Sequence, residues 1–403
     1  MNQGPDLSRK PERRSEVSPH MQKKRKGLKQ MLKAMDSAVA GLRAHQNKLD
    51  VIGNNIANVN TNGYKSQNYT FKDSLYTTAA SSSGGQANTA GAATVGGINA
   101  SQYGYGSMTG VISTDMSSTT PSYVGGFNAS INGQGFFVTK STNLRLTFSA
   151  VSGTTSKADV DKSNSALMKN SQFSFTRVGQ FSLDANGYVV DANQNFVYGY
   201  QPAKSGDTID ADGKTMEGKN ADITNPEAYD IKHLQPLRVP SSVNWKSDGV
   251  NTTAERDWEF GKYAAATGAY QSPNTDAQTA LQMKSISIDD SGIIKGTLEN
   301  KQGNPVTVVI GKVALATFQN PEGLTKAGNN TFVTNNVDNA GTVTTGVPGG
   351  ANSTLMAGYL EGSNVDLAKE FSDMITAERG FQANSKMITV SDEVLQELVN
   401  MKR

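Results

Sequence analysis

The sequence predicts an α+β protein of several domains. A helix at each end of the chain pairs with the other as a coiled-coil-like domain, and discontinuous all-β domains are nested between them. Three observations predict this class. Apolar residues recur every seven positions near both ends, short alternating runs bounded by glycine and asparagine fill the middle, and 403 residues allow more than one buried core.

The composition excludes several kinds of chemistry. Charged residues make up 18% of the chain, against about 25% in a typical soluble protein. There is no cysteine, which excludes disulfides and thiolate metal sites. The three histidines, His20, His45 and His233, lie too far apart for a common metal-ligand spacing. No apolar run is long enough to span a membrane, and the N-terminus lacks the apolar core of a secretory signal. We therefore expect no cofactor, no metal and no membrane insertion.

Residues 1–30 differ in charge from the rest of the chain. They carry nine basic and three acidic side chains, whereas residues 31–403 carry 29 basic and 33 acidic ones. The body thus lacks the positive face that nucleic-acid binding requires, and we predict no nucleic-acid partner. With prolines among few apolar residues, 1–30 is predicted to be a disordered basic leader. The alternative is that the run Lys23–Lys26 contacts nucleic acid or anionic lipid.

The first element is predicted to be a helix over residues 31–59. Its apolar residues form one narrow stripe with heptad spacing, which needs a partner. The helix is expected to end at the turn-forming run 60–63. His45 lies within it, and we expect that side chain to pack rather than to act as a base. The stripe contains Met35, Val39, Leu42, Leu49, Ile52 and Ile56.

The last element is predicted to be a second helix over residues 364–402, with its cap supplied by the run 363–366. Its stripe contains Leu367, Phe371, Met374, Phe381, Ile388, Leu395 and Leu398. Two single-stripe helices predict pairing with each other or with copies in neighbouring subunits, so both stripes together form the predicted assembly interface. The alternative is an ordinary helix pair on a globular core.

The middle of the chain is predicted to be β. Residues 77–103 are rich in Gly, Ser, Ala and Thr and indicate a loop or a loosely held extended arm. The run 184–187 predicts a hairpin turn. Strands are expected at 127–131, 135–138, 173–175, 180–183, 188–190, 287–288, 292–297, 307–310 and 313–318. The predicted domains are a leader (1–30), a helical assembly domain (31–65 plus 356–403), a β-rich core (66–201 plus 285–355) and an inserted outer β domain (202–284).

Several strings that resemble chemical sites fail on spacing. Asp212–Thr215 contains Gly-Lys-Thr, but Thr208 stands where a phosphate loop needs its first glycine. The calcium-loop-like runs 210–213 and 184–193 lack an acidic ligand at the twelfth position. Turn formation explains all three. Because no nucleophile, base and orienting group come together, we predict no catalytic, cofactor-binding or metal residue and no enzymatic activity.

Five stretches carry a resemblance to a known family. Residues 31–35 and 41–65, which include the run Gly53-Asn54-Asn55-Ile56-Ala57-Asn58, resemble the N-terminal signature of the bacterial flagellar rod and hook proteins. Residues 362–403 resemble the C-terminal signature of the same family, and the last twelve are most similar to its hook members. Two central motifs, 133–137 and 175–181, are similar to the family's β-domain motifs. Residues 202–284 resemble the family only in their position in the chain and in their expected β character.

The resemblance implies a structural subunit that polymerises into the flagellar hook, a flexible joint that transmits torque from rod to filament. It implies terminal helices forming an inner tube around an export channel. The implied partners are further copies of the chain in a helical tubular homopolymer, the distal rod protein, the hook cap (scaffold) protein, the hook-filament junction protein and the flagellar export apparatus. The implied location is the extracellular hook, reached by type III export without a cleaved signal peptide. The alternatives are a distal-rod or hook-associated axial protein and, further off, an adhesin or enzyme.

Overall fold

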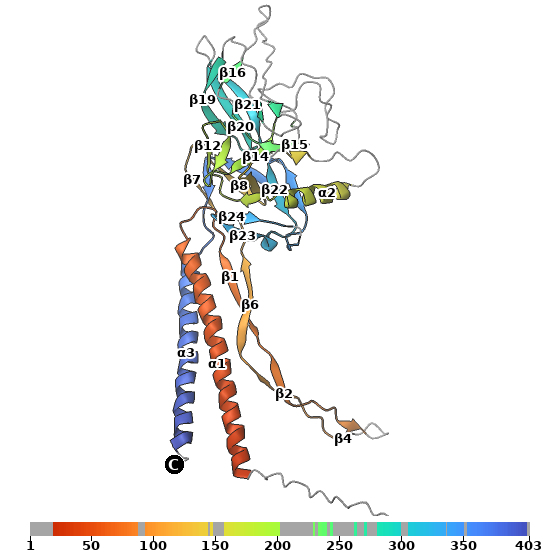
Figure 1. Cartoon of the computed structure of the whole chain (residues 1–403), viewed down its shortest axis with the longest axis vertical. Coiled ribbons are helices and arrows are strands. Elements are labelled where there is room, and N and C mark those ends of the chain that lie inside the picture. The colour runs from red at the N-terminus through yellow and green to blue at the C-terminus, as the bar shows by residue number, and fades with distance from the viewer. Residues whose placement is uncertain are drawn as a thin grey trace, which may run out of the picture. The chain divides into compact units, whose positions relative to one another are not determined.

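The chain forms two compact units in the computed structural model (Figure 1). Unit 1 takes Met1–Ile56, Gln67–Ser113 and Asp366–Arg403, and unit 2 takes Ala57–Ser66 and Thr114–Val365. The chain therefore passes from one unit to the other at four places. The structure describes residues 19–87, 93–143, 146–147, 157–201, 229, 233–239, 242–244, 262–263, 270–271, 280–299, 305–335, 337–349 and 353–400.

Unit 1 contains two long helices, α1 (Pro19–Ala57) and α3 (Leu367–Asn400), and an extended ribbon of antiparallel strands that runs beside α1 (Figure 1). The carboxylate of Asp366 caps α3, since its Oδ1 accepts hydrogen bonds from the backbone N of Ala368 at 2.9 Å and of Lys369 at 3.3 Å. The ribbon pairs β1 (Gln67–Asp73) with β6 (Ser107–Thr114), β2 (Tyr76–Ala80) with β5 (Ser101–Gly104), and β3 (Gln86–Ala87) with β4 (Ala93–Val95).

The structure differs from the prediction of a disordered leader over residues 1–30. Helix α1 begins at Pro19, so residues 19–30 are helical and not disordered. Proline is tolerated in the first turn of a helix because its missing N–H has no partner there. Leu28 lies one heptad before Met35, and the helix continues through it. Residues 1–18 lie outside the described part of the chain.

Unit 2 is built on a sheet of 15 strands among the described residues. Its main path runs β16-β19-β20-β21-β14-β9-β11-β24-β23, with the other strands of the sheet attached at its sides. The sheet strands are β9 (Phe136–Lys140), β10 (Leu146–Thr147), β11 (Ser174–Thr176), β12 (Phe181–Leu183), β13 (Val189–Asp191), β14 (Phe196–Tyr200), β15 (His233–Pro236), β16 (Ser242–Asn244), β19 (Ala280–Ile288), β20 (Ile293–Glu299), β21 (Pro305–Val313), β22 (Leu315–Phe318), β23 (Thr325–Gly328), β24 (Thr331–Val333) and β25 (Val343–Gly346).

Smaller elements complete unit 2. Three further strand pairs are antiparallel: β8 (Ala129–Gly133) with β26 (Ser353–Ala357), β7 (Pro121–Tyr123) with β27 (Tyr359–Glu361), and β17 (Lys262–Tyr263) with β18 (Tyr270–Gln271). A short 3-10 helix covers Pro321–Gly323, and one helix, α2, spans Lys157–Asn170. The predicted strands around 129–138, 174–190 and 287–318 are confirmed.

Two buried clusters lie on opposite sides of strand β9. Consecutive side chains of a strand point to opposite faces, so Phe136 joins one cluster with Phe318 and Phe332, and Phe137 joins the other with Phe181. Phe136 is 3% exposed and Phe137 is fully buried. The run Gly133–Phe137 of the sequence therefore supplies both cores from one strand.

The two acidic turn motifs form turns, as predicted. Asp184 Oδ1 accepts hydrogen bonds from the backbone N of Asn186 at 2.9 Å and of Tyr188 at 2.7 Å. Strands β12 and β13 pair across this turn. Asp191 Oδ1 accepts from the backbone N of Asn193 and Asn195, both at 2.8 Å. These carboxylates are occupied by their own backbone.

The domain boundaries differ from those predicted. Residues 67–113 belong to unit 1 with the helices, because they pair with one another as the ribbon and lie against α1. Within the predicted insert 202–284, the segment 233–239 is part of the core, where Leu234 and Leu237 are fully buried. The runs 210–213 and 212–215 lie outside the described residues.

Helix α2 is a further difference. Its sequence is polar, with few apolar residues at helical spacing, so no periodicity pointed to it. It is held to the sheet by Met168, which is 1% exposed, and by Ser165, whose Oγ accepts a hydrogen bond from the backbone N of Val343 at 2.8 Å.

Candidate assembly surface

Helices α1 and α3 of unit 1 contact each other through polar groups. Lys48 Nζ lies 3.0 Å from Asp373 Oδ1. Asn55 Nδ2 donates to Glu370 Oε1 at 3.0 Å, and both side chains are buried. Burial raises the pKa of Glu370. The helices are therefore antiparallel neighbours whose contact depends on residues that a hydrophobic pattern does not select.

Two glycines lie at this contact. A Cβ placed on Gly380 would lie 2.5 Å from Cε1 of His45, and one on Gly41 would lie 2.6 Å from Nδ2 of Asn384. Real Cβ atoms do not approach other atoms this closely, so either substitution requires the opposing side chain to move. Glycine at both positions lets His45 and Asn384 pack against the facing helix.

The predicted assembly stripes are only partly buried within the single chain. Ile52 is buried, whereas Phe371 remains 50% exposed and Val39 38% exposed. Exposed with them are Leu367 and Phe381, and half-buried are Met35, Leu42, Leu49, Ile56, Met374, Ile388 and Leu395. The side chain of Leu398 lies outside the described part. The α1–α3 contact thus runs beside the stripes and leaves much of their apolar surface open.

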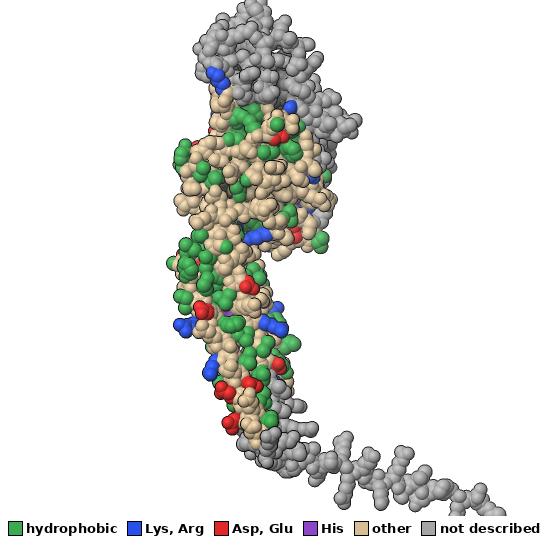
Figure 2. Space-filling view, turned by 60° about the vertical axis from the view of Figure 1, so that its left-hand side comes forward, with side chains coloured by type: hydrophobic (Ala, Val, Ile, Leu, Met, Phe, Trp, Pro, Cys, Tyr) green, Lys and Arg blue, Asp and Glu red, His purple; other side chains and the backbone are tan. Residues whose placement is uncertain are grey.

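Unit 1 exposes apolar side chains that the heptad pattern missed. Figure 2 shows hydrophobic side chains over the surface of the helical unit, mixed with charged ones. On α3 these include Ile375, Met387, Val390, Val394 and Val399, and on the ribbon they include Phe71, Leu75, Tyr76, Ile98, Tyr103, Met108, Val111 and Ile112. Aromatic residues at every second position, in the runs 69–71 and 103–105, were the available signal for the ribbon strands. Contiguous exposed apolar surface marks sites of protein association.

His45 occupies the point where α1 meets α3 and the ribbon. Its ring lies 5.2 Å from the ring of Phe71 and is in contact range of Gly380. Its Nδ1 atom is buried and has no hydrogen-bond partner among the described residues. Burial, and then the charge of Lys48, lower the pKa of His45. The expected packing role agrees with this environment.

We predict that unit 1 loses stability as the pH falls from 7.5 to 5. A histidine whose pKa is lowered by folding contributes stability that is complete above its unfolded value, about 6.5, and that is lost as the pH falls from this value to the lower pKa of the folded state. Circular dichroism of the helical signal during thermal unfolding of the assembled protein, in which both helices are ordered, measures the effect. His45→Leu should remove most of the difference between the two pH values. An equal loss in the wild type and the variant would assign the pH dependence to other groups.

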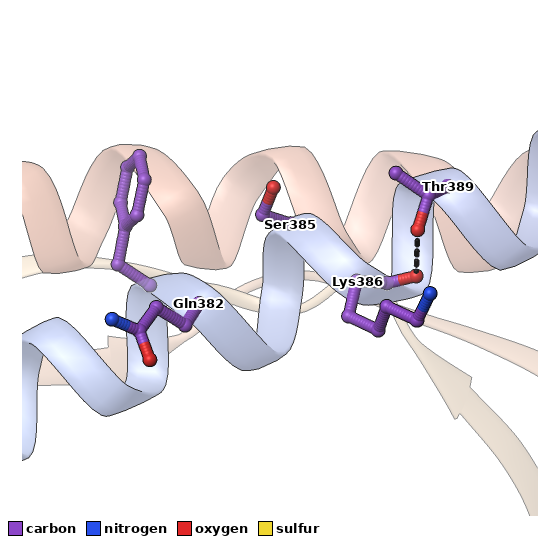
Figure 3. A pocket seen from close by; sticks show the side chains of 5 residues that line it. Gln382, Ser385, Lys386 and Thr389 are labelled. Carbon is purple, nitrogen blue, oxygen red and sulfur yellow. Dashed lines mark hydrogen bonds between the residues drawn. The ribbon is translucent and has the colours of Figure 1, made fainter.

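A shallow groove lies on the outward side of α3 (Figure 3). Its lining residues, Phe381, Gln382, Ser385, Lys386 and Thr389, all come from this one helix. Thr389 Oγ1 donates to the backbone O of Lys386 at 2.9 Å, and Gln382 Nε2 donates to Glu378 Oε1 at 3.1 Å. Polar groups converging from several elements are typical of a small-molecule site, and this groove offers those of one helix.

The described residues provide no group of three or more His, Cys, Asp and Glu side chains that could hold a metal. No helix in the described part is both long enough and apolar enough to cross a bilayer.

Long terminal helices with open apolar stripes, together with a β unit, define a structural protein built for association. Residues 356–401 match the family described as flagellar basal body rod FlgEFG protein C-terminal, and residues 35–65 match the flagella basal body rod protein family. The chain is 32% identical over 376 residues to the flagellar basal-body rod protein FlgG of Bacillus subtilis, covering 93% of this chain and all of the relative. The chain belongs to the family of flagellar rod and hook proteins.

Hook proteins are among the relatives. The flagellar hook protein FlgE of Borreliella burgdorferi is 27% identical over 463 residues, and that of Escherichia coli is 26% identical over 457 residues. Each match covers 92% of this chain and all of the relative. The family predicted from the sequence is thereby confirmed, and it is a family of structural proteins.

Proposed function

We propose that this chain is a structural subunit that polymerises into the flagellar hook. Support comes from end-to-end similarity to hook proteins of distant bacteria and from the similarity of the last twelve residues to hook members of the family. The observation that carries the proposal is the open apolar surface of unit 1, which a single chain leaves exposed to water.

In this proposal the terminal helices pair as a coiled-coil-like domain and their stripes pack against copies of α1 and α3 in neighbouring subunits. Repetition of one interface between identical subunits with a helical rotation produces an open tube. Helices of this kind are marginal alone and gain most of their stability from packing. Their ordering is therefore coupled to assembly, with an export channel enclosed by the tube.

The proposed partners follow from a place between rod and filament. They are further copies of the chain, the distal rod protein, the hook cap, the hook-filament junction protein and the export apparatus. The proposed location is the extracellular part of the flagellum, reached through type III export. The 32% identity to a rod protein favours a distal-rod role as the second candidate. Deletion of the gene distinguishes the two, because loss of a hook subunit leaves complete rods without hooks.

Limited proteolysis of the purified subunit and of its polymer tests the coupling of folding to assembly. We expect cleavage within 31–65 and 356–403 in the free subunit and protection of both segments in the polymer. Unit 2 should resist cleavage equally in both states. Terminal helices that already resist protease in the isolated subunit would contradict the proposal.

A further inference from the structure

Three of the four places where the chain passes between the units are joined by a ring of hydrogen bonds within unit 2. Ser66, Asp115 and Asn364 each lie within two residues of such a place. The backbone N of Ser66 donates to Asn364 Oδ1 at 2.6 Å, and Asn364 Nδ2 donates to the backbone O of Asp115 at 2.9 Å. The backbone N of Asp115 donates to the backbone O of Ser66 at 2.9 Å, which closes the ring. One asparagine side chain thus fixes three chain segments against one another.

An ion triad of Lys65, Arg177 and Glu361 adjoins this ring. Glu361 accepts from Arg177 Nε at 2.7 Å and Nη2 at 3.1 Å, and from Lys65 Nζ at 2.8 Å. The side chains of Lys65 and Glu361 are each 1% exposed and that of Arg177 is 3% exposed. Lys65 also donates to the backbone O of Ser117 at 2.5 Å, and the backbone N of Thr119 donates to Glu361 at 3.3 Å. We call the ring and the triad together the crossing clamp.

The triad is better suited to holding its chain segments in place than to raising the stability of unit 2. Burial would raise the pKa of Glu361, but the hydrogen bond and charge of Arg177, with Lys65, hold it below its usual value. Burial lowers the pKa of Lys65, although the negative charge of Glu361 acts in the opposite direction and raises it. Replacing a buried ion cluster by apolar residues is often neutral or stabilising, so stability alone does not account for it. The guanidinium group of Arg177 also donates to the backbone O of Gly133 at 3.0 Å and of Gly135 at 2.8 Å. Because this group is planar, these bonds fix the orientation of the Arg177 side chain as well as its distance from Glu361.

The clamp holds the ends of both terminal helices. Helix α1 ends at Ala57, and six residues later the backbone N of Gly63 donates to the backbone O of Glu361 at 2.8 Å. Helix α3 begins at Leu367, three residues after Asn364. All these hydrogen bonds lie inside unit 2, and none of them involves a residue of α1 or α3.

We propose that the crossing clamp primes assembly by holding the end of α1 beside the start of α3 before either helix orders. This inference rests on the proposed function, in which the helices order on joining the polymer. Two segments anchored next to each other meet at a high effective concentration, and little loop-closure entropy remains to be lost. A subunit without the clamp must bring the two helices together while it binds, which slows each addition.

The variant Asn364→Ala opens the ring and leaves the triad in place. With purified full-length subunits growing on preformed hook seeds, we expect the elongation rate to fall and the critical concentration to rise, each about tenfold. The control is Asn193→Ala, which removes a comparable amide-to-carbonyl bond, Asn193 Nδ2 to Asn329 O at 3.1 Å, elsewhere in unit 2. The unfolding midpoint of unit 2 is measured for both variants, and the control should elongate at the wild-type rate.

A double variant, Ser66→Cys with Asn364→Cys, separates anchoring from general stability. The natural chain has no cysteine, so the two introduced thiols have only each other as an intramolecular partner, and thiol titration establishes that the disulfide has formed before growth is measured. We expect wild-type elongation when it is oxidised and the slow rate when it is reduced. Equal, wild-type rates in both redox states, or a normal rate for Asn364→Ala, would overturn the clamp proposal. Failure of the wild-type subunit to grow on hook seeds would instead overturn the proposed function, so the two failures are distinguishable.

Discussion

Leu42→Asp and Phe381→Asp are each expected to abolish polymerisation. Leu42 is half-buried on α1 and Phe381 is 37% exposed on α3. Both belong to unit 1, so neither contributes to the core of unit 2. In the proposed tube both become buried against neighbouring subunits. Burying an unpaired carboxylate costs several kcal/mol, and the cost recurs in every subunit of the polymer.

The measurement is seeded growth followed by electron microscopy, with the critical concentration determined for each variant. An increase of at least about a hundredfold, equivalent to about 2.7 kcal/mol, is expected. Unit 2 should unfold within about 0.5 kcal/mol of the wild type, as for most surface substitutions. Gln46→Asp and Ser385→Asp introduce the same charge at exposed polar positions of the same helices and should assemble normally. Normal hooks from either stripe variant would remove these residues from the proposed interface.

The helices could be predicted from sequence because heptad spacing of apolar residues survives even where those residues remain exposed. Phe371, half exposed, marks α3 as clearly as Ile52, which is buried, marks α1. The same rule failed for residues 19–30, where charged side chains gave no apolar stripe although the helix continues. Heptad spacing of apolar residues identifies a helix face that needs a partner, but it does not detect a helix that is polar on all sides.

The contact between the helices could not be predicted. It uses Lys48, Asn55, Glu370 and the two glycines Gly41 and Gly380, residue types that are usually assigned to solvent or to turns. The crossing clamp could not be predicted from the sequence for a related reason. Lys65 and Glu361 are charged and almost 300 positions apart, and such residues are rarely buried unless paired. Sequence spacing carries no information about which distant charge will provide the partner.

Gly179→Ala is expected to destabilise unit 2 severely. Gly179 belongs to the run 175–181, and its backbone O accepts a hydrogen bond from the backbone N of Ala129 at 2.9 Å. A Cβ at this position would lie 1.6 Å from the backbone O of Ala129 and 2.9 Å from the ring of Phe137. Because one of these neighbours is backbone and the other is fully buried, neither can move aside without disturbing the strands around it.

The free energy of unfolding of unit 2, measured by denaturant titration, should fall by about 3 kcal/mol or more, at the upper end of the range for overpacking. Gly346→Ala is the matched control, since a Cβ there meets nothing within 4 Å. That substitution should be neutral or slightly stabilising, because alanine reduces the conformational entropy of the unfolded chain. Equal stabilities for the two variants would show that strand β8 and the run 175–181 do not approach each other as closely as this fold requires. Such a result would also separate Arg177 from the backbone carbonyls of Gly133 and Gly135 that orient it.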